Sequence, residues 1–313
     1  MSSILSKAKL GSQLGGRPPV AVELSPEGVL AAASPGQEQS LIYAFEPLPP
    51  GALEPGIAEK NLRSPEVVAA AIRTAIEQVS LRTRSVTVVL PDTVVRVFVL
   101  DFDSFPTRPD EAIPVLRFRL RKMVPFDVEH AGLSYQVLLE NKNECKVLAA
   151  VVPGPVLQEY EAAVRQAGYE PGAVLPTSLA ALAAIESEEP VLTANLGEVA
   201  LTTCITHGND LLLYRTLDLP LDANLRLQEV QRGIAVAAAY YEDRIGERPR
   251  VLHFAGIGIG ARGDNVAEEF ARWIDDPELT VTDLAPRPET GAATPLGNLV
   301  SLAGVVGALA GAA

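Results

Sequence analysis

The chain has 313 residues, of which 48% are hydrophobic and 21% are charged, so it is large enough for a globular protein of one or two domains with a sizeable core. Its 39 acidic and 26 basic residues give a formal net charge of −13. Because an acidic surface repels phosphates, the composition argues against nucleic acid or anionic lipid as the primary partner.

Short strands and helices are predicted to alternate along the chain. Residues 1–16 are interpreted as a flexible leader and residues 37–61 as a strand followed by a loop. Further strands are predicted at residues 20–23, 29–33, 85–90, 94–100, 133–138, 146–152, from 174, 191–195, 200–205, 210–216, 250–254 and 279–283. Helices are predicted at residues 64–79, 110–123, 155–166, 177–186, 225–245, 265–273 and 296–313.

The order of these elements contains a weak repeat. A strand, a turn and a second strand begin near residue 20 and again near residue 191, and helices and further strands follow each time. Such an internal duplication favours a two-lobed α/β fold. We interpret residues 85–90 and 94–100, which Pro91-Asp92-Thr93 separates, as a pair of strands.

A distinctive segment lies at residues 119–139. A predicted helix ends at Met123, Val124-Pro125-Phe126 and an acidic spacer follow, and a strand then contains Ser134-Tyr135-Gln136-Val137. This combination resembles the PilM family, whose members carry an "IPFP…DYQ" segment after a helix. Similar pieces occur in the same order at residues 20–31, 192–215, 252–260 and 299–313. The resemblance therefore extends from about residue 20 to the end of the chain.

The resemblance implies an actin-like (ASKHA) α/β fold in which two lobes, each with a mixed five-stranded sheet and flanking helices, enclose a nucleotide cleft. It also implies a small inserted α/β subdomain. The expected parts are a leader at 1–16, the first part of lobe I at 17–84, the inserted subdomain at 85–152, the rest of lobe I at 153–189, lobe II at 190–296 and a C-terminal helix returning to the core at 297–313.

In actin-like proteins two hairpin turns offer backbone N–H groups to phosphates, and an Asp on each hairpin holds Mg²⁺ through water. The candidate nucleotide-binding positions that the resemblance implies here are Glu23, Ser25, Asn195, Gly197, Thr202, Gly256 and Gly258. Glu23 and the neutral Asn195 stand at the two Asp positions, and Pro26 removes an N–H donor beside Ser25. Two lost charged hydrogen bonds weaken affinity about 10²–10⁴-fold.

We therefore expect a degenerate nucleotide site with no catalytic residue, no metal site and no required cofactor. Binding of ATP with Mg²⁺ is kept as an open alternative. The resemblance implies a cytoplasmic scaffold of a type IV pilus-like assembly complex at the inner membrane. It would dock the N-terminal cytoplasmic tail of a PilN-like membrane protein and could form a ring of its own copies. Val124, Pro125 and Phe126 are the candidate partner-binding residues, with a place in the core as their alternative.

Two other functions stay open. One is an ATPase or sugar-kinase-like enzyme of the same superfamily, and the other is a polymerising scaffold like FtsA that attaches to a membrane. The basic cluster Arg117, Arg119, Arg121 and Lys122 is either a solvated helix face or a contact with an acidic partner or the inner membrane. Residues 296–313 are almost uncharged but rich in glycine, which favours a small-residue helix packed inside the fold over membrane contact.

Overall fold

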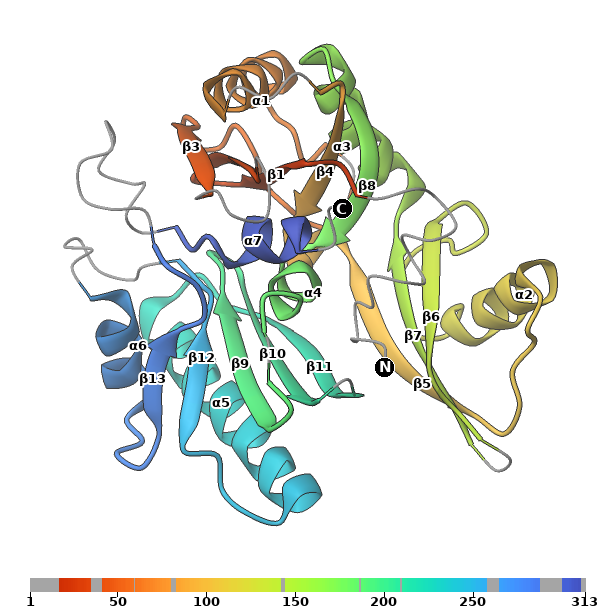
Figure 1. Ribbon diagram of the computed structural model, residues 1–313, viewed down its shortest axis with the longest axis vertical. Coiled ribbons are helices and arrows are strands. Elements are labelled where there is room, and N and C mark those ends of the chain that lie inside the picture. Colours follow the sequence, from red (N-terminus) through yellow and green to blue (C-terminus); the bar gives the residue numbers. More distant parts are fainter. Residues whose placement is uncertain are drawn as a thin grey trace.

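The computed structural model describes residues 17–34, 41–58, 60–79, 83–141, 144–185, 187–208, 210–257, 265–287 and 300–310. The expected leader, residues 1–16, lies outside them. Figure 1 shows three parts, which are lobe I at the top, lobe II below it and a small subdomain at the right. The predicted two-lobed α/β architecture with an inserted subdomain is confirmed.

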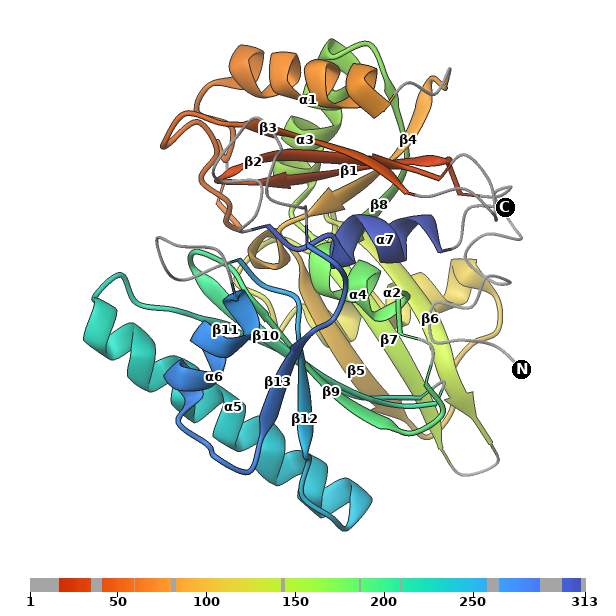
Figure 2. The ribbon, with the colours of Figure 1, turned by 60° about the vertical axis from the view of Figure 1, so that its left-hand side comes forward.

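Lobe I contains a five-stranded sheet in the order β3-β2-β1-β4-β8. Its strands are β1 (Val20–Ser25), β2 (Gly28–Ala33), β3 (Ile42–Pro47), β4 (Ser85–Leu90) and β8 (Glu170–Pro176). Helices α1 (Pro65–Val79) and α3 (Gly154–Gln166) pack on one face, where alternate strand residues such as Val22 and Val88 are buried. Helices α4 (Thr177–Leu182) and α7 (Ala303–Leu309) cover the other face (Figure 2).

Lobe II repeats this topology. Its sheet has the order β11-β10-β9-β12-β13 and consists of β9 (Pro190–Leu196), β10 (Ala200–His207), β11 (Asp210–Asp218), β12 (Val251–Phe254) and β13 (Thr280–Asp283). In both sheets three antiparallel strands are followed by two parallel ones. Helices α5 (Ala223–Ile245) and α6 (Val266–Ile274) pack against the apolar face. The internal duplication predicted from the sequence is confirmed.

The inserted subdomain is a three-stranded antiparallel sheet, β5-β7-β6, with α2 (Pro109–Leu120) on its outer face. Its strands are β5 (Arg96–Phe102), β6 (Gly132–Glu140) and β7 (Cys145–Val152). Because side chains alternate along a strand, Leu100 packs under α2 while Val97 and Val99 face the opposite way, toward α4 and lobe II.

Several predicted boundaries were wrong. Strand β4 pairs with β1 and β8 in lobe I, so residues 85–90 and 94–100 are not a pair, and the insertion begins at Arg96 rather than at residue 85. The short 3₁₀-helix η1 (Asp92–Val94) redirects the chain between the two sheets. Strand β8 begins earlier than Val174. Helices α2 and α4 end at Leu120 and Leu182, before the predicted ends.

The last helix packs inside the fold, as predicted. Within the described part of residues 296–313, only Ala303–Leu309 is α-helical. Its Val305 and Ala308 are buried against β-sheet residues of lobe I and against Ala180 of α4. No helix in the described ranges is long and apolar enough to cross a membrane.

Candidate functional site: the cleft between the lobes

The turns of two hairpins meet in one pocket. The β1–β2 turn of lobe I and the β9–β10 turn of lobe II line a space of about 80 Å³. Five of the predicted nucleotide-binding residues lie in its wall, namely Glu23, Ser25, Asn195, Gly197 and Thr202. The structure therefore brings together residues that are far apart in the sequence, as the resemblance implied.

The first turn satisfies its own polar groups. The Ser25 hydroxyl accepts a hydrogen bond from Gly28 N at 3.3 Å and donates one to Gly28 O at 3.1 Å. Pro26 has no N–H to offer. Glu27 also lines the pocket, and burial raises the pKa of its carboxyl. This turn presents an acidic side chain where a phosphate-binding turn presents free amide donors.

Glu23 holds a carboxyl group in an enclosed position. Its Oε1 accepts a hydrogen bond from Thr177 Oγ1 at 3.3 Å, while its Oε2 is buried and has no partner among the described residues. Gly304 of α7 lies so close that a methyl group there would overlap the carboxyl. Burial raises the pKa of Glu23 to about 8, and the negative charges of Asp92 and Glu27 add to this rise.

This raised pKa predicts a pH dependence of stability. The native carboxyl keeps its proton up to about pH 8, whereas an unfolded Glu loses it near pH 4.5. The native state then binds more protons, so stability falls as pH rises through this window and the loss is complete above about pH 8. Glu23→Gln mimics the protonated form, so it should add little at pH 4.5 and a few kcal/mol above pH 8, because each tenfold change in proton affinity is worth about 1.4 kcal/mol.

Urea unfolding at pH 4.5, 6.5 and 8.5 measures the difference between the two proteins. Glu242→Gln, at an exposed position on α5, is the matched control and should show no pH-dependent difference. A Glu23→Gln effect of equal size at all three pH values would contradict an enclosed, neutral carboxyl.

The residues of the second hairpin are engaged within the protein. Thr202 Oγ1 hydrogen-bonds Thr216 Oγ1 at 3.1 Å, so this hydroxyl is directed along the sheet. Arg226 of α5 donates to the carbonyl oxygens of Gly197, at 2.8 Å, and Glu198. Glu198 also lines the pocket. The second turn therefore brings a further carboxylate to the cleft, together with an arginine that is bound to backbone carbonyl oxygens.

Asp92 joins the two lobes. It follows β4 in η1 and is only 8% exposed. Its carboxylate accepts hydrogen bonds from Ser178 N at 2.9 Å, the Ser178 hydroxyl, Asn195 Nδ2 at 3.2 Å and Tyr214 OH at 3.0 Å. Asn195 also donates to Ser178 Oγ at 3.1 Å. We call these four residues, Asp92, Ser178, Asn195 and Tyr214, the Asp92 cluster.

The sequence interpretation missed Asp92 and treated residues 91–93 only as a break between strands. A usable signal was present, because Asp92 follows the buried, β-branched β4 after only one residue, Pro91. β4 is parallel to β1 and β8, and ligand-binding groups in α/β sheets gather at the carboxyl ends of parallel strands. Burial and the charge of Asp92 together raise the pKa of Tyr214 well above its ordinary value, so its hydroxyl stays a donor.

The predicted adenosine-side turn is only partly described. Gly256 follows β12, and a side chain there would come within 2.8 Å of Leu196 Cα. Ile257 N donates to Leu196 O at 2.9 Å. Gly256 therefore lets two strand ends approach closely, which accounts for the glycine without a ligand. Gly258 lies outside the described residues.

The predicted partner-binding residues lie in the inserted subdomain, between α2 and β6. Val124 is buried in the subdomain core and Phe126 packs against that core, while Pro125 is exposed. The alternative of a core position therefore applies to Val124. Partner binding by Val124, Pro125 and Phe126 stays a prediction.

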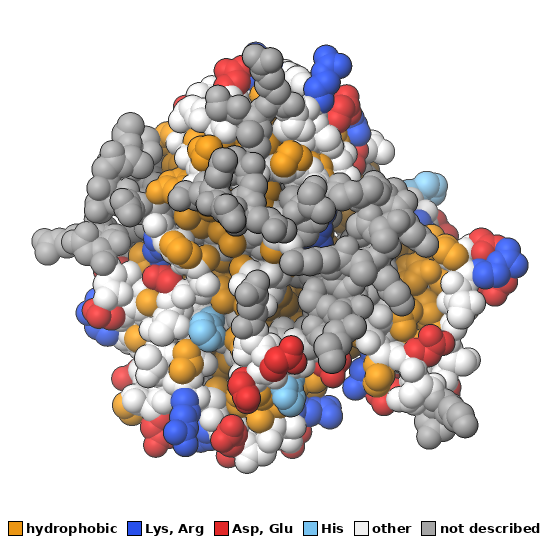
Figure 3. All heavy atoms as spheres, viewed as in Figure 1, with side chains coloured by type: hydrophobic (Ala, Val, Ile, Leu, Met, Phe, Trp, Pro, Cys, Tyr) orange, Lys and Arg blue, Asp and Glu red, His pale blue; other side chains and the backbone are white. Residues whose placement is uncertain are grey.

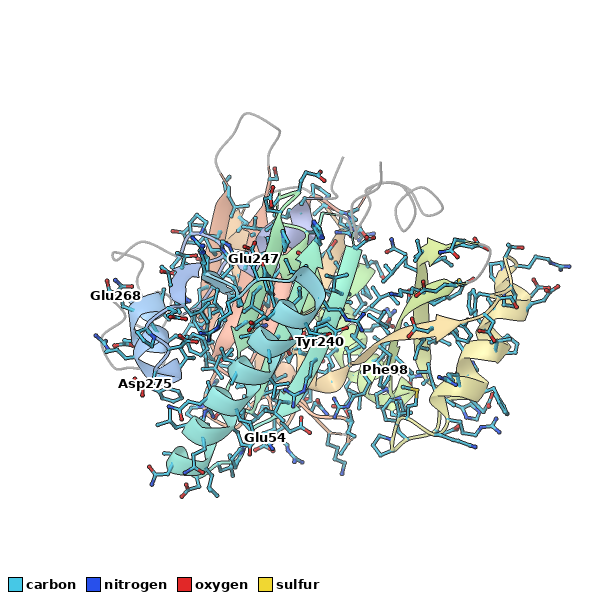
Figure 4. All side chains as sticks on the ribbon, turned by 90° about the horizontal axis from the view of Figure 1, so that it is seen from below. Glu54, Phe98, Tyr240, Glu247, Glu268 and Asp275 are labelled. Carbon is cyan, nitrogen blue, oxygen red and sulfur yellow. The ribbon has the colours of Figure 1, made fainter. Side chains whose placement is uncertain are left out.

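A second concave surface, the β5–β11 groove, separates the inserted subdomain from lobe II. It has a volume of about 360 Å³ and a mixed lining of polar groups and apolar side chains, the latter including Val97, Val99, Leu139, Leu213 and Tyr214. Figure 4 shows Phe98 and Tyr240 on its two sides. β5 and β11 are edge strands of their sheets.

No group of three His, Cys, Asp or Glu side chains within the described ranges could hold a metal ion.

No family model matches the sequence, and no curated protein matches it. Solved structures do match. A chain of a PilM–PilN type IV pilus biogenesis complex superposes with a TM-score of 0.68 and 19% identity over 94% of this chain and 99% of that one. A Bacteroides thetaiotaomicron protein with an actin-like ATPase fold and unknown function superposes with a TM-score of 0.51 and 10% identity, over 93% of this chain and 94% of that one. The cytoplasmic domain of EpsL, an inner-membrane component of the Vibrio cholerae type II secretion system, has a TM-score of 0.49 and 15% identity, over 90% of this chain and 92% of that one. The chain has the actin-like fold, as predicted, and its likeness to the PilM–PilN complex extends over nearly its whole length.

Proposed function

We propose that the protein is a non-catalytic scaffold of a type IV pilus-like assembly complex on the cytoplasmic side of the inner membrane, where it docks the N-terminal tail of a PilN-like membrane protein. The likeness to a chain of the PilM–PilN complex, which covers nearly all of both chains, carries this proposal. The segment at residues 119–139 supports it independently, because it resembles the PilM family in the part of the chain that forms the inserted subdomain.

The chemistry of the cleft supports a scaffold rather than an ATPase. With a pKa of about 8, Glu23 is mainly protonated at neutral pH and offers little charge to Mg²⁺. The amide of Asn195 is already bonded to Asp92 and Ser178. Glu27 and Glu198 line the same pocket and repel phosphate. The space of about 80 Å³ is also small beside the roughly 300–1,000 Å³ of pockets that hold drug-sized ligands.

The β5–β11 groove is the docking site that the described surface supports best. An extended peptide can add to an exposed strand edge and place alternate side chains in apolar pockets. The groove offers both, since two sheet edges border it and apolar side chains such as Val97, Val99 and Leu139 form part of its wall. Asp101, Lys146, Asp210 and Arg244 also line it and provide charges of both signs for orienting a tail.

A peptide titration tests the proposal. A fluorescent peptide with the N-terminal sequence of a PilN-like protein encoded beside this chain should bind with a dissociation constant of tens of micromolar or tighter. Leu139→Arg, which places a charge in the groove wall, should weaken binding about tenfold or more. Val137→Arg is the matched control. It lies on the same strand and is 37% exposed against 38% for Leu139, but it does not line the groove.

Two results would count against the scheme. Absence of binding at tens of micromolar would remove the proposed partner, and equal weakening by Leu139→Arg and Val137→Arg would remove the groove as its site.

Mg–ATP should neither raise the melting temperature nor change the peptide affinity. A clear thermal shift with Mg–ATP would favour the ATPase or kinase-like alternative instead.

A further inference from the structure

The exposed side of α2 carries apolar side chains among cations. Phe118 is 73% exposed, and Val115, one helical turn before it, is also exposed. Arg119 and Lys122 lie beside Phe118 on the solvent side of the helix and the turn that follows, and Met123 extends the apolar surface. Leu116 and Leu120 point the other way, into the subdomain core. We call Val115, Phe118, Arg119, Lys122 and Met123 the α2 face.

The charge of this face is positive although the chain as a whole is acidic. The neighbouring carboxylates already have basic partners. Asp110 lies 2.7 Å from Arg108, Glu129 lies 2.5 Å from Arg121, and Asp127 is bonded to His130 at 2.6 Å. Arg119 and Lys122, by contrast, form no ion pair with any described residue. These two cations are free to bind an anionic group outside the protein.

The position of α2 favours a broad surface as the partner. The helix lies on the side of the inserted subdomain that points away from both lobes (Figures 1 and 4). In Figure 3 the outer edge of the inserted subdomain carries both acidic and basic side chains. A protruding aromatic ring beside two free cations fits the interface of a lipid bilayer, where rings lie at headgroup depth and long basic side chains reach lipid phosphates.

We propose that the α2 face contacts the surface of an anionic lipid bilayer, with Phe118 among the headgroups and Arg119 and Lys122 on lipid phosphates. The contact is local and weak because two cations act against a net charge of −13. Stable attachment to a membrane generally takes two signals. The α2 face supplies one of them, whether or not the tail of a membrane protein supplies the other.

Vesicle binding tests this inference with the full chain alone. Phe118→Trp combined with Trp273→Phe leaves one tryptophan as the reporter, since Trp273 is the natural one. Vesicles of phosphatidylethanolamine and phosphatidylglycerol at low salt should shift its emission to the blue. Vesicles of phosphatidylcholine should not, and high salt should reverse the shift. In sedimentation assays, Phe118→Glu and the pair Arg119→Glu, Lys122→Glu should each bind about tenfold less.

Leu221→Glu is the matched control, because Leu221 is an 88% exposed leucine elsewhere on the molecule. It should bind vesicles like the unaltered chain, and circular dichroism should show all variants folded. Failure to bind anionic vesicles at millimolar lipid, or equal binding by all variants, would overturn the inference. Binding to polyglutamate without binding to vesicles would also overturn it and would indicate an acidic protein partner. None of these results depends on the peptide titration.

Discussion

Replacing Asp92 with alanine should lower the free energy of unfolding by about 3–5 kcal/mol. The carboxylate accepts hydrogen bonds from Ser178, Asn195 and Tyr214, which come from α4, β9 and β11. Without it the amide N–H of Ser178, the amide group of Asn195 and the hydroxyl of Tyr214 lose their acceptor in a buried place, and each such loss costs about 1–3 kcal/mol. Urea unfolding measures the change.

Because Asp92 joins lobe I to two strands of lobe II, its loss should also loosen the closure of the cleft. Small-angle scattering should then show a larger radius of gyration for Asp92→Ala than for the unaltered chain. Asp103→Ala removes an exposed carboxylate from the inserted subdomain and should stay within about 0.5 kcal/mol. A loss below about 1 kcal/mol for Asp92→Ala, near the value of one ordinary hydrogen bond, would show that the Asp92 cluster does not hold the lobes together.

Replacing Gly307 with alanine should destabilise the protein by about 3 kcal/mol, at the upper end of the usual cost of overpacking. Helices α4 and α7 pack with their backbones in contact, and a methyl group on Gly307 would overlap the carbonyl oxygen of Ala180 and lie 2.7 Å from its carbon. The backbone cannot rotate away as a side chain can. The sign of the change in stability is informative, because Gly→Ala at a helix position with room for a methyl group stabilises by up to about 1 kcal/mol.

Gly233→Ala provides the control for Gly307→Ala. Gly233 is also helical, in α5, and a methyl group there would lie 2.7 Å from Leu201 Cδ2, the far end of a flexible side chain. Leu201 can shift by a rotamer change, so this variant should remain within about 1 kcal/mol of the unaltered chain. Equal stability of Gly307→Ala and Gly233→Ala in thermal and urea unfolding would contradict a direct backbone contact between α4 and α7 at Gly307.

The Asp92 cluster gives a physical reason for the asparagine at position 195. The Asn195 amide is 3.2 Å from a carboxylate oxygen of Asp92 and donates to it. An aspartate there would set two carboxylates against each other in a buried place, which is strongly unfavourable unless one is protonated. The neutral residue at the second Asp position and the closed arrangement of the lobes therefore depend on each other.

Tyr214 connects the two concave surfaces of the molecule. Its hydroxyl donates to Asp92 in the cleft, while the same residue lines the β5–β11 groove. A peptide in that groove would contact a side chain that also holds the lobes closed. This connection rests on one residue of β11 that the sequence did not distinguish from its neighbours.

The sequence by itself determined the class of fold and most of its elements. Alternating β-branched runs and helical spacing mark the strands and helices, and the repeated opening near residues 20 and 191 marks the two lobes, because these patterns are local along the chain. The resemblance to the PilM family also implied the positions of Glu23 and Asn195 on facing hairpins. These residues do line one pocket.

Only the tertiary structure decided what the cleft contains and where the insertion begins. Asp92 and Tyr214 are 122 positions apart, and their hydrogen bond exists only because two sheets close on each other. Strand β4 joined lobe I rather than the insertion because its pairing with β1 and β8 buries both of its faces. Pairing between distant strands leaves no periodic signal in the sequence, so side-chain pattern alone cannot specify which sheet a strand enters.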